Sequence, residues 1–182
     1  IGGGDDNDEN LAIAWQDSIR GGDCHNTIYF RYSDNTQGAT WWPDLTQSAQ
    51  PIYYRGVGLD NDQLSPALAY DGSNKYIYAV WQDDWNWYNG QQHPYDANCD
   101  GKPPFGDYDI YFARFGLDPA RPVDYRKGVR VTRINDNAGR NANQMDPDIE
   151  VVTDTNKSTI YVVWTDRRNG NDDIYFSRSD NA

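Results

Sequence analysis

The chain has 182 residues and a formal net charge of −12 at pH 7, from 16 basic and 28 acidic side chains. This acidic balance lacks the basic footprint that binding to nucleic acid requires, so nucleic acid is not expected as a partner. Aromatic residues make up 14% of the chain, which argues against intrinsic disorder because disordered chains are poor in aromatics. No apolar run approaches the about 18 residues of a transmembrane helix, so no membrane span is expected.

Three segments of the chain resemble one another, and each predicts a β-strand that ends in Trp-x-Asp. They are Leu11–Asp17, Ile77–Asp83 and Ile160–Asp166. An Ile-Tyr-Phe triplet follows each of them, and the triplets begin at Ile28, Ile110 and Ile174. The interval from a triplet to the next Trp is nearly constant, whereas the interval from a Trp to its triplet varies. A constant core with one variable loop is typical of a structural repeat.

Two further strands complete the predicted unit. A strand beginning with proline precedes the second and third Trp strands, at Pro66–Asp71 and Pro147–Val152. Candidates for a last strand are Ile52–Arg55 and Lys127–Thr132. No segment has helical periodicity. The sequence therefore predicts an all-β fold of about three four-stranded antiparallel blades of the β-propeller type, with a β-sandwich as the alternative.

The pattern within each strand predicts its place in the sheet. Thr159–Trp164 is β-branched and aromatic with almost no polar interruption, as expected of a strand covered on both faces. Asp173–Arg178 alternates less cleanly and is expected to lie further out. Between them, Asn169-Gly170 favours a tight hairpin because both residue types tolerate positive φ.

The whole chain, 1–182, is interpreted as one repeat region with three units. The first unit spans about 1–64 and lacks its first strand, the second spans about 65–144, and the third spans about 145–182 and lacks its last strand. An incomplete propeller leaves sheet edges and apolar flanks uncovered. We therefore expect either further blades of a longer chain or self-association through the open blade edges to cover them.

The sequence resembles the secreted, sialidase-like β-propellers that carry Asp-box repeats. The resemblance rests on Val129–Thr132, Pro147–Val152 and Ile160–Ser179 and covers nearly the whole chain. It implies a secreted or cell-surface protein. The Asp box itself is only partly kept, with Thr36 at the position of its Asp. The arginine motif of sialidases is absent, and no catalytic residues can be assigned.

The loop after the second Trp strand contains the most specific metal-binding pattern. Asp96, Asn98 and Asp100 stand at alternate positions and Gly101 follows, which is the spacing of an EF-hand calcium loop. Lys102 would contribute its backbone carbonyl and Asp107 would close the shell. The sequence thus predicts a calcium site here, with a series of Asx turns as the alternative.

The same loop supplies aromatic residues and a cysteine. Stacking of aromatic rings on a sugar is one role for the aromatics, and a small core of the loop is the alternative. The candidates for glycan contact are Trp85, Trp87, Tyr88 and Tyr95. Cys24 and Cys99 lie in equivalent loops of adjacent units, which predicts a disulfide bond between them and an oxidising compartment.

Taken together, the residues favour a non-enzymatic function. We expect a calcium-stabilised extracellular module with a structural, adhesive or assembly role, including filament formation. The alternative is a propeller that binds glycans or processes glycosides, which would require two carboxylates at a defined separation across a pocket.

Overall fold

The computed structural model describes ten β-strands and no helix within residues 11–17, 26–33, 41, 50–52, 62–74, 76–83, 108–116, 130–134, 143–154 and 157–180. The strands are β1 (Leu11–Asp17), β2 (Thr27–Ser33), β3 (Gln50–Pro51), β4 (Gln63–Asp71), β5 (Tyr76–Asp83), β6 (Asp109–Gly116), β7 (Arg130–Arg133), β8 (Gln144–Asp154), β9 (Lys157–Asp166) and β10 (Asp173–Ser179). The predicted all-β class is therefore confirmed for this part of the chain.

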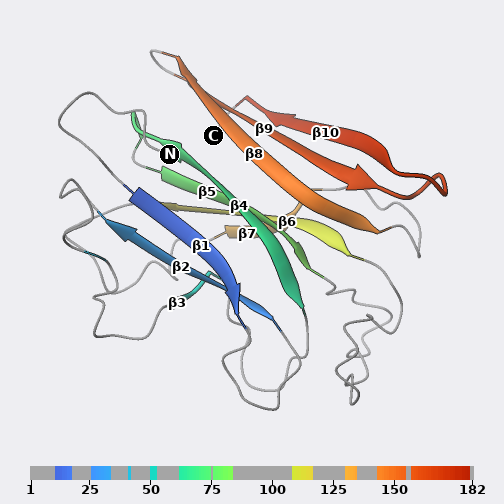
Figure 1. Ribbon diagram of the computed structural model, residues 1–182. Helices are drawn as coiled ribbons and strands as arrows, with labels where there is room; N and C mark the ends of the chain where they lie inside the picture. The colour runs from blue at the N-terminus through green and yellow to red at the C-terminus, as the bar shows by residue number, and fades with distance from the viewer. Residues whose placement is uncertain are drawn as a thin grey trace.

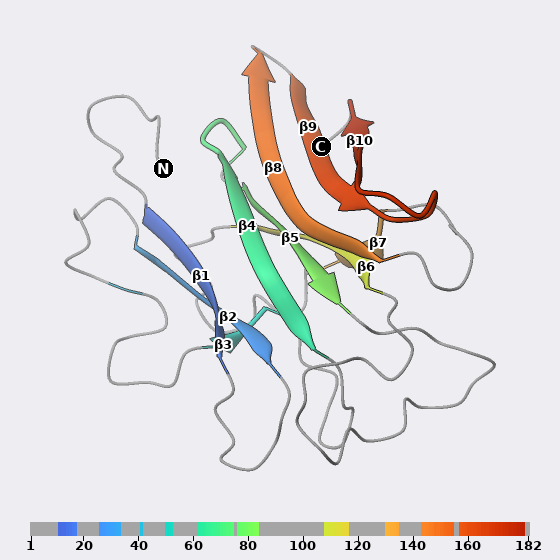
Figure 2. The ribbon, with the colours of Figure 1, turned by 45° about the vertical axis from the view of Figure 1, so that its right-hand side comes forward.

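The strands form three antiparallel sheets in which neighbours in sequence are neighbours in space. The first sheet has the order β1-β2-β3, the second β4-β5-β6-β7 and the third β8-β9-β10. Figures 1 and 2 show the three sheets lying side by side, with the second between the other two. The predicted last strand Lys127–Thr132 overlaps β7, which pairs with β6. In the first unit the strand that pairs with β2 is β3, which ends just before the predicted Ile52–Arg55.

The core consists of two layers of apolar side chains, one on each face of the second sheet. Strand β5 divides its residues by alternation: Ile77, Ala79 and Trp81 pack toward the first sheet, and Tyr78 and Val80 pack toward the third. All five are essentially inaccessible to solvent. Strand β5 is thus covered on both faces, and it holds the three sheets together.

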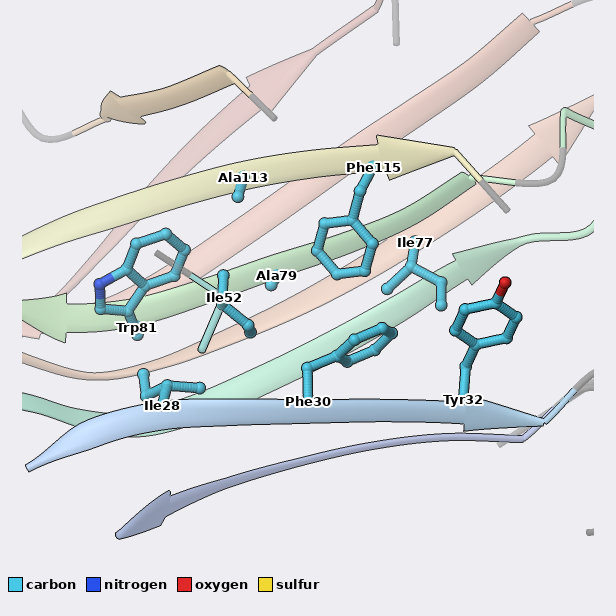
Figure 3. Packing of buried hydrophobic residues seen from close by; sticks show 9 residues of the cluster. All are labelled: Ile28, Phe30, Tyr32, Ile52, Ile77, Ala79, Trp81, Ala113 and Phe115. Atoms are coloured by element: carbon cyan, nitrogen blue, oxygen red, sulfur yellow. The ribbon is translucent and has the colours of Figure 1, made fainter. Parts of the chain in front are cut away.

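The layer between the first and second sheets, which we call the first junction, is aromatic at its centre. Phe30 of β2 meets Phe115 of β6 edge to face, with ring centroids 4.7 Å apart and an interplanar angle of 70°. Figure 3 shows this pair among the side chains that the two sheets contribute. The layer between the second and third sheets, the second junction, brings Ile149, Ile160 and Trp164 onto the second sheet.

Strands β4 and β8 each carry a β-bulge close to their first residue, a glutamine. The pairing register shifts between Leu64 and Ala67 in β4 and between Met145 and Asp148 in β8. Inside each bulge one residue before a proline has positive φ: Ser65 at 52° and Asp146 at 50°. This conformation costs energy for any residue with a Cβ, so a matched strained position in two units marks a structural repeat.

One prediction about burial is wrong for the strand on which it was made. Strand β9 has one buried and one partly exposed face, with Val163 on the exposed face, although its sequence predicts burial on both faces. The difference has a physical reason: the third sheet packs on the second sheet with one face, and no described residue covers the other. Strand β10 lies at the edge of its sheet, as predicted.

Candidate functional site: the sheet junctions and the uncovered faces

The residues predicted to bind ligands lie outside the described part of the chain. This holds for the calcium loop, for the cysteine pair and for the aromatic side chains of the loop that follows β5. They are Asp96, Asn98, Asp100, Lys102, Asp107, Cys24, Cys99, Trp85, Trp87, Tyr88 and Tyr95. The calcium site, the disulfide bond and the glycan contacts therefore stay predictions. Within the described ranges, no group of His, Cys, Asp or Glu side chains is arranged to hold a metal ion.

The second junction is fixed at one end by a hydrogen bond to the bulge of β8. The backbone amide of Asp146 donates to the side-chain carbonyl of Gln82 on β5, at 3.0 Å. The first junction repeats this contact: the amide of Ser65 donates to Gln16 on β1, also at 3.0 Å. In both cases the glutamine of Trp-Gln-Asp holds the residue with positive φ in the following sheet.

A second repeated contact lies at the same end of each junction. The amide of Gln63 donates to the carbonyl of Asn26 at 2.9 Å, and the amide of Gln144 donates to the carbonyl of Tyr108 at 2.8 Å. In return, the amide of Asn26 donates to Asp62 at 2.7 Å, and that of Tyr108 donates to Asn143 at 3.1 Å. Backbone pairing therefore continues from one sheet to the next, and the two junctions are built alike.

The opposite end of the second junction is fixed by Asp71, the last residue of β4. Its buried carboxylate accepts hydrogen bonds from the amides of Ser73 and Asn74, from the side chain of Asn74, and from the hydroxyl of Ser158 on β9. Burial by itself would raise the pKa of Asp71. The hydrogen bonds from Ser158, Asn74 and Ser73 outweigh burial and hold that pKa below its ordinary value.

The carboxylates at the ends of the second and third Trp strands, Asp83 and Asp166, are buried, whereas Asp17 at the end of the first is exposed. The indole N–H of Trp81 donates to Asp83, and that of Trp164 donates to Asp166, each at 3.2 Å. Gln63 also donates to Asp83, at 3.2 Å. At Asp166 the amide of Arg168 also donates to the carboxylate, at 2.9 Å, so this aspartate caps an amide of the turn that follows β9.

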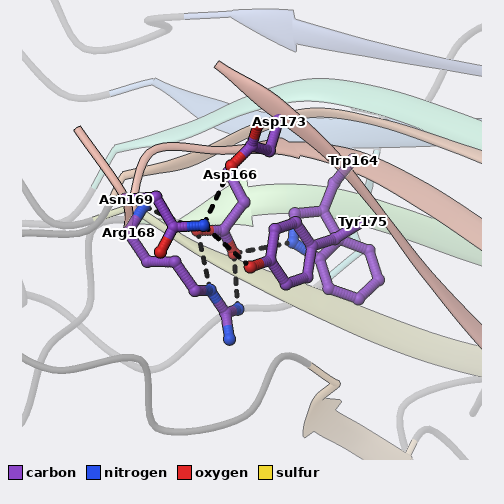
Figure 4. Close-up of polar contacts among 6 residues, drawn as sticks. All are labelled: Trp164, Asp166, Arg168, Asn169, Asp173 and Tyr175. Atoms are coloured by element: carbon purple, nitrogen blue, oxygen red, sulfur yellow. Dashed lines mark hydrogen bonds and ion pairs between the residues drawn. The ribbon is translucent and has the colours of Figure 1, made fainter. Parts of the chain in front are cut away.

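Asp166 is the centre of a polar cluster at the β9–β10 turn, which Figure 4 shows. The guanidinium of Arg168 donates two hydrogen bonds to it, at 3.0 and 2.5 Å, and lies 4.1 Å from the centre of the Tyr175 ring. Burial raises the pKa of Asp166, but the hydrogen bonds from Arg168 and Trp164 bring that pKa below its usual range. A hairpin turn does join β9 and β10 at Asn169-Gly170, and within it Gly170 has positive φ, 85°.

The Tyr78 hydroxyl is a buried polar group in the second junction. It makes no hydrogen bond of normal geometry among the described residues, and the carboxylate of Asp71 lies near it. Burial, together with the nearby negative charge of Asp71, raises the pKa of Tyr78 to about 12. The phenol is therefore neutral at physiological pH, and its position gives it no activated oxygen for chemistry.

The outer face of the third sheet carries exposed apolar side chains. Relative exposure is 38% for Val163, 76% for Ile174 and 57% for Phe176. The outer face of the first sheet is similar, with Leu11 at 38% and Ile13 at 45%. Isolated exposed apolar residues are ordinary, but grouped apolar residues on a strand face indicate a contact surface.

The residues that fix the junctions were not identified from the sequence. Gln16 and Gln82 stand at the same place in Trp-Gln-Asp of two units. This recurrence was the available signal for the junction contact, because a polar residue that recurs at one repeat position is expected to have the same kind of partner each time. Thr165 replaces the glutamine in the third unit.

No protein-family model matches the chain, and a search of curated proteins gives no significant match. The part of the chain that the structure describes contains no helix of the length and hydrophobicity that crossing a membrane takes.

Proposed function

We propose that this chain is a structural module: a stack of β-propeller-type blades, extracellular and stabilised by calcium, that acts in structure, adhesion or assembly. The observation that carries the proposal is the repetition of the sheet junction. Gln16 with Ser65 and Gln82 with Asp146 form the same contact between successive sheets. A unit that stacks by the same contacts each time is the basis of a propeller or another repeat array.

The state of the buried carboxylates favours this role over catalysis. Asp71 and Asp166 both accept several hydrogen bonds from neighbouring turns and strands, and the pKa of each is lowered. A general acid at neutral pH requires a raised pKa and access to substrate. Each of these carboxylates instead connects strands or turns, which is structural work.

Calcium and an extracellular location complete the proposal on the strength of the sequence. The Asp96–Asp107 loop has calcium-binding spacing, and it lies between the Trp strand and the triplet strand of the second unit. The sialidase-like resemblance and the two cysteines both favour a secreted or cell-surface protein.

The alternative function is glycan binding or glycoside processing. Trp85, Trp87, Tyr88 and Tyr95 favour it, because aromatic rings stack on the C–H faces of sugars. All four residues are in the same long loop as the calcium pattern. The structural role needs the carboxylates of this segment to bind calcium, whereas the alternative needs its aromatic rings to bind a sugar.

Thermal unfolding with and without a calcium chelator tests the proposal. Because a ligand bound only by the folded state stabilises that state, chelation is expected to lower Tm, and added Ca²⁺ to restore it. In the Asp100→Asn variant the shift should be lost, whereas Asp180→Asn, at an exposed position after β10, should keep it. An unchanged Tm in chelator, together with glycan binding or hydrolysis that Trp85→Ala and Trp87→Ala abolish, would replace the proposal with its alternative.

A further inference from the structure

The outer face of the third sheet has the same composition and geometry as a face that is buried in the second sheet. Tyr161, Val163, Ile174 and Phe176 occupy the repeat positions of Tyr78, Val80, Ile110 and Phe112. Tyr161 stacks on Phe176 with centroids 6.0 Å apart, and Tyr78 stacks on Phe112 at 5.9 Å. In the second sheet, this face is the one that receives the third sheet.

The two faces differ in what covers them. Val80 and Ile110 are completely buried, whereas Val163 and Ile174 are exposed. The sequence of β9 also predicts burial on both faces, as its equivalent β5 has. The outer face of the third sheet is therefore built as an acceptor for another sheet of the same kind.

The outer face of the first sheet has the composition of the opposite partner. Leu11, Ile13 and Trp15 occupy the repeat positions of Ile160, Val162 and Trp164, which the third sheet presents to the second. Trp15 and Tyr29 lie side by side with centroids 6.0 Å apart, and Trp164 and Tyr175 do so at 6.2 Å. Figure 1 shows the first and third sheets on opposite sides of the second, so the two outer faces lie at opposite ends of the stack.

From this correspondence we propose that the outer face of the third sheet of one copy binds the outer face of the first sheet of a second copy. The inference rests on the proposed assembly function and names its partner. The two faces are different halves of one junction, so the contact is head to tail. Contacts of this kind close into a ring or continue as a filament, depending on the rotation between copies.

Two features set the conditions of this contact. In the second junction, β8 of the third sheet packs on β4 and β5. Among the described residues the first sheet has no equivalent of β8, because no strand pairs with β1 on the side away from β2. Binding through β1 and β2 alone is smaller in area, so association should depend on protein concentration. Each copy has a net charge of −12, so repulsion opposes association and added salt should strengthen it.

Sedimentation velocity on the 182-residue chain and two face variants tests the proposal. Ile13→Asp places a charge on the outer face of the first sheet, and Phe176→Asp places one on that of the third. Both side chains are exposed, and circular dichroism and Tm check that the variants fold. Phe176→Ser replaces Phe176→Asp if the latter does not fold. Ser179→Asp adds the same charge to β10 on the opposite side of the strand and is the matched control.

Head-to-tail binding gives a specific pattern of masses. The unmodified chain and Ser179→Asp should form larger species as concentration rises, and each face variant alone should stay at the mass of one chain. An equal mixture of Ile13→Asp and Phe176→Asp should form a complex of two chains and nothing larger, because each variant keeps one intact face.

Three results would overturn the proposal: a single-chain mass for the unmodified protein at every concentration, a mixture that does not associate, or pairing of either face variant with itself. These results leave the calcium-dependent Tm unaffected. Failure of this inference is therefore distinguishable from failure of the proposed structural role.

Discussion

Gln82 accepts a 3.0 Å hydrogen bond from the backbone amide of Asp146, a residue held at a φ of 50° in the neighbouring sheet. The bond joins the end of β5 to the bulge of β8, and the same relationship joins Gln16 to Ser65 in the first junction. A side chain of one repeat thus stabilises a strained turn in the next. This coupling makes the stability of each sheet depend on its neighbour.

Replacing Gln82 by Ala is expected to destabilise the protein by about 1–3 kcal/mol, because a partly buried amide loses its acceptor. Urea unfolding followed by tryptophan fluorescence measures the change as a lower midpoint at an unchanged slope. Gln16→Ala is the matched control: it removes the same bond at an exposed position, so its effect should be less than about 1 kcal/mol. Equal losses in both variants would contradict this account of the junction.

Acid is expected to weaken the fold through Asp71 and Asp166. The folded-state pKa of each is below its value in the unfolded chain, about 3.9, so the unfolded chain binds protons first as pH falls. Their stabilisation is complete above about pH 5 and is lost progressively as the pH falls below about 4. Stability measured by urea unfolding from pH 6 to pH 3 should decline over that window.

The variant Asp71→Asn identifies how much of the acid effect comes from that group. It should cost about 1.5–3 kcal/mol at pH 7, because hydrogen bonds from Ser158 and Asn74 to a charged acceptor become bonds to a neutral one. It should also flatten the decline in stability toward pH 3. A variant as stable as the original protein at pH 7, with the same decline, would show that Asp71 does not hold the second junction.

Replacing Tyr78 by Phe is expected to leave stability unchanged or raise it by up to about 1 kcal/mol. The reason is that the Tyr78 hydroxyl is buried and makes no hydrogen bond of normal geometry among the described residues, so its removal relieves a cost of desolvation. Tyr161→Phe, at the equivalent and partly exposed position of the third sheet, should have no effect. A loss above about 1 kcal/mol in the first variant would mean that the hydroxyl has a hydrogen-bond partner, with the nearby Asp71 carboxylate as the candidate.

A disulfide bond between Cys24 and Cys99 is expected in the protein purified without reductant. Peptide mapping by mass spectrometry should find the two cysteines in one linked fragment, and reduction should lower stability by about 2–5 kcal/mol, as in small secreted domains. Two thiols that react with a thiol reagent in the denatured, unreduced protein would rule the bond out.

The repeat was predictable from the sequence because its signals are local. Trp81 and Trp164 with the triplets at Ile110 and Ile174 identify the strand pairs β5–β6 and β9–β10. The starts of β4 and β8 were not predictable, because each strand begins before its proline and passes through a bulge. A proline ordinarily indicates a strand edge, and nothing local reports a register shift.

The contacts between sheets could not be predicted for a different reason. Ser158 contacts Asp71, and Gln82 contacts Asp146, although the two residues of each pair are far apart in sequence. They meet because the sheets stack on one another. The burial of β9 illustrates the same limit. Its apolar sequence predicts burial on both faces, whereas Val163 is exposed on the outer face.

The account depends most on the claim that the two outer faces are halves of one junction. Hydroxyl-radical footprinting at increasing protein concentration measures this directly, because it reports the solvent access of single aromatic side chains. Trp15 and Phe176 should become progressively protected as concentration rises, while Trp81, already buried, should react little throughout. Reactivity of Trp15 and Phe176 that stays constant across the whole concentration range would contradict the claim.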